Sequence, residues 1–116
     1  MNKDIKSLEL KVNLLHERIC SALGDTRRIM ILYLLAEKDM FVNEISEALN
    51  TPQSTISRHL GVLRQRSMVS TERRGTAVLY SLPDDRIIDV LDLMHTILND
   101  QIQAEAAIIK SIQQSS

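Results

Sequence analysis

Apolar residues recur at three- and four-residue spacing over the first third of the chain, which predicts two amphipathic helices. The first runs over residues 5 to about 22 and carries its stripe at Leu8, Val12, Leu15, Ile19 and Ala22. Gly24 then breaks the pattern, and Asp25 or Thr26 can cap a second helix. We expect that helix to end near residues 37–39 and to turn inward Ile29, Leu32, Leu35 and Ala36.

Residues 41–69 predict a helix, a tight break and another helix. Ile45, Ala48 and Leu49 form one short apolar stripe, and Ile56, Leu60 and Leu63 form the next. Between them, Asn50-Thr51-Pro52 interrupts the pattern. Proline has no N–H and a preset φ, so the second helix should begin near Pro52, with Thr51 accepting a bond from its free donors.

After this unit, the apolar residues recur at every second position instead of every third or fourth. Val69 and Thr71, then Val78, Tyr80 and Leu82, alternate around Gly75, which predicts a two-stranded hairpin. Pro83 ends the second strand, and a long final helix follows over about residues 84–112. Its stripe includes Ile88, Leu91, His95, Leu98, Ile102 and Ile109, more apolar surface than so small a chain can cover alone.

The helix that begins near Pro52 turns a short, polar and cationic face outward. Gln53, Ser54, Ser57 and Arg58 lie off its buried stripe. An ordinary solvated helix would carry Glu and Lys in i,i+4 pairs, but residues 53–68 contain no acid. Short hydroxyl and amide side chains permit close approach, and arginine can bind guanine or phosphate, so the pattern favours a major-groove contact.

The charge distribution supports the same interpretation. The formal net charge is −1, but residues 53–76 hold five arginines and one glutamate, which leaves +4. Residues 84–116 hold six acids and two bases, which leaves −4. A clustered basic region is the usual electrostatic footprint of a DNA-binding protein.

The length of 116 residues fits one domain and leaves no room for a separate catalytic one, and no nucleophile–base pair is visible, so we do not expect an enzyme. With three aromatic residues to fill the core, pairing of two copies would add stability. No apolar run or leader pattern indicates a membrane or export, so we expect a cytoplasmic protein. The single cysteine, Cys20, can form neither an internal disulfide nor a zinc cluster within one chain.

Two stretches resemble the ArsR/SmtB family of winged helix-turn-helix transcriptional repressors: "ALGDTRRIMILYLL" (residues 22–35) and "EISEALNTPQSTISRHLGVLRQRSMVSTERRGTAVLYSL" (residues 44–82). The resemblance implies a mainly helical single domain over residues 1–116 with a small hairpin wing. It implies that the first and last helices form a homodimer interface through Leu8, Val12, Leu15, Ile19, Leu91, His95, Leu98, Ile102 and Ile109. The expected DNA contacts are Gln53, Ser54, Thr55, Ser57, Arg58, His59 and Arg64 on the helix and Arg73, Arg74 and Thr76 on the wing.

Some of these residues have a second interpretation. His59 borders the buried stripe, so a packed histidine is as good an expectation as a base contact. The alternative to a DNA contact for Arg64 is a favourable interaction with the negative end of the helix dipole and nothing more. His16 and Cys20 are four residues apart, which suits half of a soft-metal site, whereas the alternative for Cys20 is simple packing.

The chain departs from the metal sensors of that family. The helix before the recognition helix reads "FVNEISEAL", without the cysteine pair that many of them use. Asp92 and His95 are spaced poorly for the zinc site of others. We therefore expect no metal or other cofactor, and Cys20 is a candidate for effector or redox sensing; the alternative is an inter-subunit metal site from His16, Cys20, Asp92 and His95.

The leading hypothesis is a homodimeric repressor that binds a palindromic double-stranded operator and is released by an inducer that the sequence does not identify. A protein-interaction module with the same fold is the alternative from another class, and it leaves the cationic surface unexplained.

Overall fold

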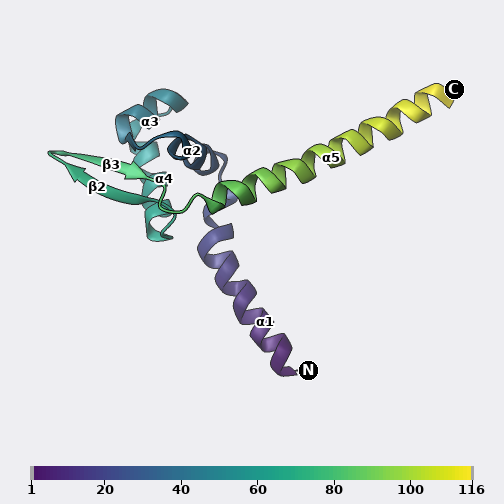
Figure 1. Ribbon diagram of the computed structural model, residues 1–116, viewed down its shortest axis with the longest axis horizontal. Helices are drawn as coiled ribbons and strands as arrows, with labels where there is room; N and C mark the ends of the chain where they lie inside the picture. The colour runs from purple at the N-terminus through teal and green to yellow at the C-terminus, as the bar shows by residue number, and fades with distance from the viewer. Residues whose placement is uncertain (1, 116) are drawn as a thin grey trace. The chain divides into compact units, whose positions relative to one another are not determined.

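The computed structural model describes the backbone of residues 2–115 and the side chains of residues 4–115. Met1 and Ser116, the ends of the predicted single domain, lie outside the described residues. The chain forms two compact units, Met1–Asp84 and Asp85–Ser116. The first holds every helix and strand except the last helix, which makes up the second unit (Figure 1).

The predicted first helix is longer at its start and changes its hydrogen bonding at its end. Helix α1 spans Asn2–Leu15, and a π-helical turn, η1, continues it over His16–Cys20. There Ser21 N–H donates to the His16 carbonyl at 2.8 Å, five residues back. The Ser21 hydroxyl also donates to the Glu17 carbonyl at 2.5 Å. A serine hydroxyl that competes for a carbonyl disturbs the regular ladder, and a short 3₁₀ turn, η2 (Ala22–Gly24), follows.

The two predicted helix starts differ in how they are capped. Helix α2 spans Thr26–Glu37, and the Asp25 carboxylate caps it by accepting from Arg27 N–H at 2.8 Å. Helix α3 spans Val42–Leu49, and the residue that caps its end, Asn50, has a φ of +48°. Helix α4 spans Gln53–Gln65, as predicted, but Thr51 does not cap it. Its hydroxyl instead donates to the Leu49 carbonyl at 2.9 Å, because the left-handed Asn50 folds the chain back on α3.

The core of the first unit comes from α2, α3 and α4, which lie together in Figure 1. Its fully buried large side chains are Ile31, Leu32, Ile45, Ile56, Leu60 and Leu63. The α4 stripe is therefore confirmed. Two inward assignments are wrong, since Ala36 and Ala48 are exposed, and Ile31 was not among the predicted core residues. An alanine at the border of a stripe buries little surface, so the larger Ile31 sets the inner side of α2.

The predicted hairpin is confirmed and gains a third strand. β2 (Ser70–Arg74) and β3 (Ala77–Ser81) pair antiparallel, and Gly75 takes a φ of +64° in the two-residue turn. The short β1 (Met40–Phe41) pairs with β3 on its other edge, with Met40 opposite Tyr80. The β2–β3 hairpin extends away from the helices as a wing (Figure 1), and β1 ties its base to the start of α3.

Helix α5 spans Arg86–Ser115 and forms the second unit, close to the predicted range of 84–112. Most of its apolar stripe is exposed, with Leu98, Ile102 and Ile109 between 47% and 57% accessible. Leu91 is the exception at 5% accessible, and its assignment to a subunit interface stays a prediction. Among the described residues, no helix is long and apolar enough to cross a membrane.

Candidate nucleic-acid interface

The outward face of α4 is polar and carries the expected arginines. Gln53, Ser54, Ser57 and Arg58 are exposed, and Thr55 is half-buried. Arg64 is also exposed, one residue before the end of the helix. Behind this face, the fully buried Ile56, Leu60 and Leu63 fix the helix to the core. The face is therefore held rigidly while its polar groups stay accessible.

The wing presents a second set of exposed groups. Arg73, Arg74 and Thr76 are all exposed at or beside the turn. The Arg74 guanidinium pairs with Glu72 at 3.2 Å, whereas Arg73 has no ion-pair partner among the described residues. Surface ion pairs of this kind contribute little free energy. Arg74 can therefore leave the Glu72 carboxylate and bind a phosphate group instead. Arg73 can bind a phosphate without first breaking an ion pair.

A hollow of about 500 Å³ lies between the start of α3, the start of α4 and the wing. Three predicted DNA contacts line it: Gln53 and Ser57 from α4 and Thr76 from the wing. The structure thus brings together residues that lie up to 23 positions apart in the chain. Asn43 and Tyr80 also line the hollow, and sequence reasoning missed them.

The reason that Asn43 and Tyr80 were missed is the short strand β1. It pairs Met40 with Tyr80 and Phe41 with Leu79, and this pairing sets the start of α3 beside the wing. A two-residue strand leaves no alternating pattern to detect. Phe41 N–H also donates to the Glu44 carboxylate at 2.9 Å, which fixes the first turn of α3 and the position of Asn43.

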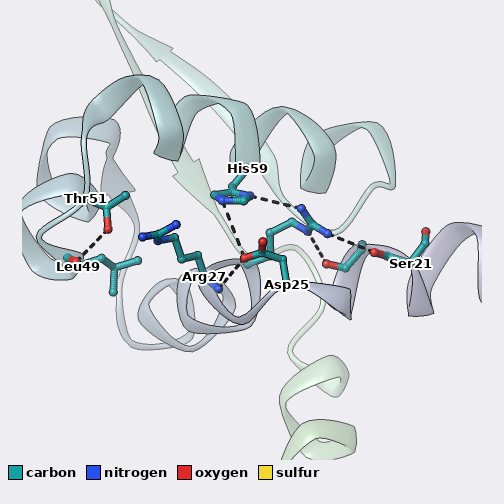
Figure 2. A network of polar contacts seen from close by, with 8 residues as sticks. Ser21, Asp25, Arg27, Leu49, Thr51 and His59 are labelled. Atoms are coloured by element: carbon teal, nitrogen blue, oxygen red, sulfur yellow. Dashed lines mark hydrogen bonds and ion pairs between the residues drawn. The ribbon is translucent and has the colours of Figure 1, made fainter.

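His59 is not part of the exposed face. Its side chain is 4% accessible, so the expected DNA contact is wrong and the packed interpretation holds. The Arg28 guanidinium lies 3.3 Å from His59 Nδ1, and because arginine can only donate, this nitrogen accepts. Nε2 faces the Asp25 carboxylate at 3.9 Å, too far for a hydrogen bond, and finds no hydrogen-bond partner among the described residues (Figure 2).

The His59 contacts join α4 to the start of α2. Arg28, which reaches His59, also donates to the carbonyls of Ala22 at 2.6 Å and Ser21 at 3.3 Å. Burial lowers the pKa of His59, and the nearby Asp25 carboxylate opposes that effect in part. The Arg27 N–H bond lowers the pKa of Asp25. At neutral pH the ring is therefore uncharged and serves to position the recognition helix.

Arg66, which contributes to the +4 segment, also faces inward. Its guanidinium donates to the Glu17 carbonyl in the π-helical turn, and its Nε is buried with no hydrogen-bond partner in the described part of the chain. With Arg18 and Ser67, Arg66 lines a second hollow of about 320 Å³. Its charge still raises the local potential, but its side chain is committed to the junction between η1 and α4.

The candidate effector residues come from two different elements, η1 and α5. His16 and Cys20 are both exposed in the π-helical turn, and Asp92 and His95 are exposed on α5. Within the described part of a single chain, no three His, Cys, Asp or Glu side chains gather as a metal site would require. The alternative of a metal site formed by these four residues across two subunits stays a hypothesis.

Comparison with known proteins agrees with this geometry. Residues 25–71 match the family model "Bacterial regulatory protein, arsR family". An HTH-type transcriptional regulator of Methanocaldococcus jannaschii is 42% identical over 77 residues, which cover 66% of this chain and 86% of that protein. The transcriptional repressor SdpR of Bacillus subtilis is 33% identical over 81 residues, which cover 70% and 90%.

A solved structure shows the same architecture. The crystal structure of Rv0081 from M. tuberculosis superposes with a TM-score of 0.72 at 29% identity, and the match covers 82% of this chain and 96% of that one. The fold, the exposed face of α4 and the wing agree with the family that the sequence comparisons identify. The chain is therefore a winged-helix transcriptional regulator that belongs to the ArsR family.

Proposed function

We propose that this regulator is a homodimeric repressor that binds a palindromic operator and leaves it when an effector binds. The hollow between α4 and the wing carries the proposal, because Gln53, Ser57 and Thr76 line it together. Arg58 on α4 and Arg73 on the wing are exposed as well. In this proposal α4 enters the major groove and Arg58 reads a base. The wing arginines bind the flanking phosphates, which fix orientation without reading sequence.

Dimerisation is supported by apolar surface that the single chain leaves uncovered. On α1, Leu8, Val12 and Leu15 are 50–57% accessible, and Ile19 in the π-helical turn is 37% accessible. On α5, Leu98, Ile102 and Ile109 show similar exposure. Contiguous apolar faces of this kind mark interaction sites, and a second copy supplies the same surface in return.

Binding to selected operator DNA tests the proposal. Genomic fragments that co-purify with the protein supply the operator, and gel shift at several salt concentrations measures affinity. We expect footprinted half-sites about 10–10.5 base pairs apart, centre to centre, or a multiple of that spacing. Lys110→Ala on α5 removes an exposed charge far along the chain from the interface and is the matched control for Arg58→Ala. If DNA binding depends neither on the salt concentration nor on Arg58→Ala, a protein-interaction module would be favoured instead.

Effector release is the second half of the proposal. Because the candidate metal ligands Asp92 and His95 are poorly spaced, we propose that zinc, cadmium and arsenite do not release the operator. If Cys20 is the sensor, oxidation of its thiolate drives release. Each metal and a mild oxidant are titrated against the operator complex of wild type and Cys20→Ser. Metal-driven release that Cys20→Ser or His95→Ala abolishes would contradict the proposal.

A further inference from the structure

The hollow at the junction of η1 and α4 has a volume of about 320 Å³, within the usual range of roughly 300–1,000 Å³ for small-molecule sites. Glu17 and Arg18 line it from η1. Gln65 from the last position of α4 lines it too, with Arg66 and Ser67 directly after the helix. None of these five residues belongs to the proposed DNA contacts or to the apolar dimer faces. The hollow is therefore a candidate site that the proposed function leaves unused.

Two guanidinium groups on this lining have no carboxylate to neutralise them. Arg18 is exposed and Arg66 is half-buried. In the part of the chain that the structure describes, neither arginine forms a salt bridge, either with Glu17 or with any other acid. Two positive charges and the one negative charge of Glu17 leave the lining at +1. The hollow therefore attracts small anions.

Arg66 has hydrogen-bonding capacity that the ligand-free chain does not use. Its guanidinium donates to the Glu17 carbonyl, and its buried Nε finds no hydrogen-bond partner among the described residues. A guanidinium carries five N–H donors in a planar fork that matches the oxygens of an oxyanion. Bonds between two charged partners are stronger than bonds to a neutral carbonyl. Arg66 therefore gains when it turns from the Glu17 carbonyl to an oxyanion in the hollow.

Ser67 adds a hydroxyl donor from a position where glycine is the usual residue. Its φ is +60°, the left-handed conformation that commonly ends a helix. Ser67 N–H donates to the Arg64 carbonyl at 3.0 Å, and Met68 N–H donates to the Leu63 carbonyl at 2.9 Å, so this turn is well fixed. A glycine would hold the same turn but would bring no hydroxyl to the hollow. Side-chain donors thus reach it from both sides of the junction.

The donors suit a phosphate group on a small molecule. A phosphate monoester presents three terminal oxygens and carries a charge of about −1.5 to −2 at neutral pH, whereas a carboxylate presents two oxygens and a single charge. Two guanidinium groups and a hydroxyl match the larger charge and the third oxygen. A phosphate of the DNA backbone lies on the outside of the duplex, where exposed groups such as Arg58 and Arg73 can reach it. The half-buried Arg66 favours a ligand small enough to enter the hollow.

We infer that this hollow binds a small phosphate-bearing molecule between Arg18 and Arg66, and that this molecule is an effector that weakens operator binding. The second part rests on the proposed function. The negative charge of the ligand lowers the positive potential of residues 53–76, to which Arg66 belongs. Arg66 also leaves the Glu17 carbonyl, a contact that attaches the end of α4 to η1. The ligand then binds DNA-free protein more tightly and, by linkage, lowers the affinity for the operator.

Titration of the full chain with inorganic phosphate tests the site without DNA. NMR spectra at neutral pH and constant ionic strength measure the dissociation constant from the shifts of residues 17, 18 and 65–67. Arg18→Gln removes one guanidinium from an exposed position, so the dissociation constant should rise about tenfold or more. Arg64→Gln removes a nearby exposed arginine that does not line the hollow, and it should leave phosphate affinity unchanged.

The same titration with acetate tests the chemical class of the ligand. Acetate should bind more weakly than phosphate to the wild-type protein and should depend less on Arg18. Acetate that binds as tightly as phosphate would overturn the assignment to phosphate. Equal losses of phosphate affinity in Arg18→Gln and Arg64→Gln would show a general effect of charge and no site.

Two further variants should change phosphate affinity in opposite directions while the fold is kept. Ser67→Gly removes the hydroxyl and supplies the residue that the left-handed conformation favours, so phosphate should bind more weakly although Tm does not fall. Glu17→Gln removes the acid from the lining, so phosphate should bind more tightly. Thermal unfolding without phosphate checks the stability of both variants. A folded Ser67→Gly protein with wild-type phosphate affinity, or a Glu17→Gln protein with lower affinity, would contradict the inference.

Operator affinity with and without saturating phosphate, at equal ionic strength, tests the effector role. In wild type, phosphate should lower operator affinity by roughly 5–150-fold, and Arg18→Gln should lose most of this response. Phosphate that binds in the hollow and leaves operator affinity unchanged overturns the effector role alone. A protein that binds phosphate but no operator under any condition overturns the proposed function and leaves the site standing. If phosphate does not bind and Arg18→Gln weakens operator binding, the hollow holds a phosphate of the DNA backbone and the inference is wrong.

Discussion

Helices α4 and α5 have the same kind of apolar stripe and opposite exposure. On α4, Ile56, Leu60 and Leu63 are fully buried, because α2 and α3 of the same chain cover them. On α5, Leu98 and Ile102 are about half accessible. The periodicity of a helix thus shows that it has a face to bury, but it does not show what covers that face.

The two helices also differ in charge. The α4 and wing segment, residues 53–76, carries +4, whereas residues 84–116 carry −4. The acidic unit repels the phosphate backbone that the basic unit attracts. This difference supports the proposal that α4 binds DNA and α5 forms a protein interface, and the following measurements test that proposal.

The salt dependence of operator binding should show the largest effect. A dimer that presents two +4 segments is expected to neutralise roughly 6–10 phosphates and release their counterions. Affinity should then fall about 10³–10⁵-fold between 50 and 200 mM salt, as measured by fluorescence anisotropy. An affinity that does not change over this range would contradict the proposal that α4 binds DNA.

Substitutions in the apolar stripes of α4 and α5, made one at a time, should separate folding from dimer assembly. Leu60→Ala leaves a cavity in the core of the first unit, so the free energy of unfolding should fall by about 2–5 kcal/mol. Leu98→Asp sets an unpaired carboxylate in the proposed apolar interface, which should yield a folded monomer without operator binding. Chemical denaturation and sedimentation measure the two outcomes.

Leu93→Asp is the matched control for Leu98→Asp. It introduces the same charge on the other face of α5, where the side chain is 63% accessible, and should leave the dimer intact. A Leu98→Asp protein that remains dimeric and binds DNA would show that the exposed stripe of α5 has another purpose.

The agreement between sequence and structure was best where local pattern decides. The boundary at Pro52, the hairpin around Gly75 and the α4 stripe all follow from spacing and turn chemistry. Strand β1 was missed because its two residues show no pattern, and it exists only through pairing with β3. That pairing also determines where Asn43 lies.

The remaining differences concern the direction in which side chains point, and not the type of secondary structure. His59 and Arg66 are polar residues beside a helix face, and pattern alone leaves open whether they point outward. The structure turns His59 toward Arg28 and Arg66 toward the Glu17 carbonyl, contacts that span 31 and 49 residues. Contacts between distant segments of this kind depend on the packing of the whole unit.

Arg58→Ala should have a smaller effect that distinguishes two kinds of DNA contact. If Arg58 reads a guanine, its loss should cost about 1–3 kcal/mol on the operator and relax the preference at one position in each half-site. If it binds only phosphate, binding to operator and scrambled DNA should weaken alike. Parallel titrations of both duplexes, with Lys110→Ala as the control, separate these cases.

His59 should give the smallest effect, a pH dependence of stability confined to the acid side of neutrality. Burial lowers the pKa of His59, and Arg28, Arg58 and Arg27 act in the same direction against the opposing Asp25 carboxylate. The unfolded chain therefore takes up a proton near pH 6.5 while the folded chain does not. Stability should be fully present above that pH and should fall as the pH drops toward the folded pKa, with a slope below about 1.4 kcal/mol per pH unit.

Thermal unfolding of His59→Gln and His16→Gln between pH 5 and 8 tests this last expectation. His59→Gln should be less stable at pH 8, because Arg28 loses its acceptor, and should show a weaker pH slope below 6.5 than wild type. His16 is exposed in the π-helical turn, so His16→Gln should keep the wild-type slope. The pKa of Asp25 is also lowered, but that carboxylate affects stability only as the pH falls below its unfolded value of about 3.8, outside the measured range. An unchanged slope in His59→Gln would show that the buried ring does not couple protonation to the position of α4.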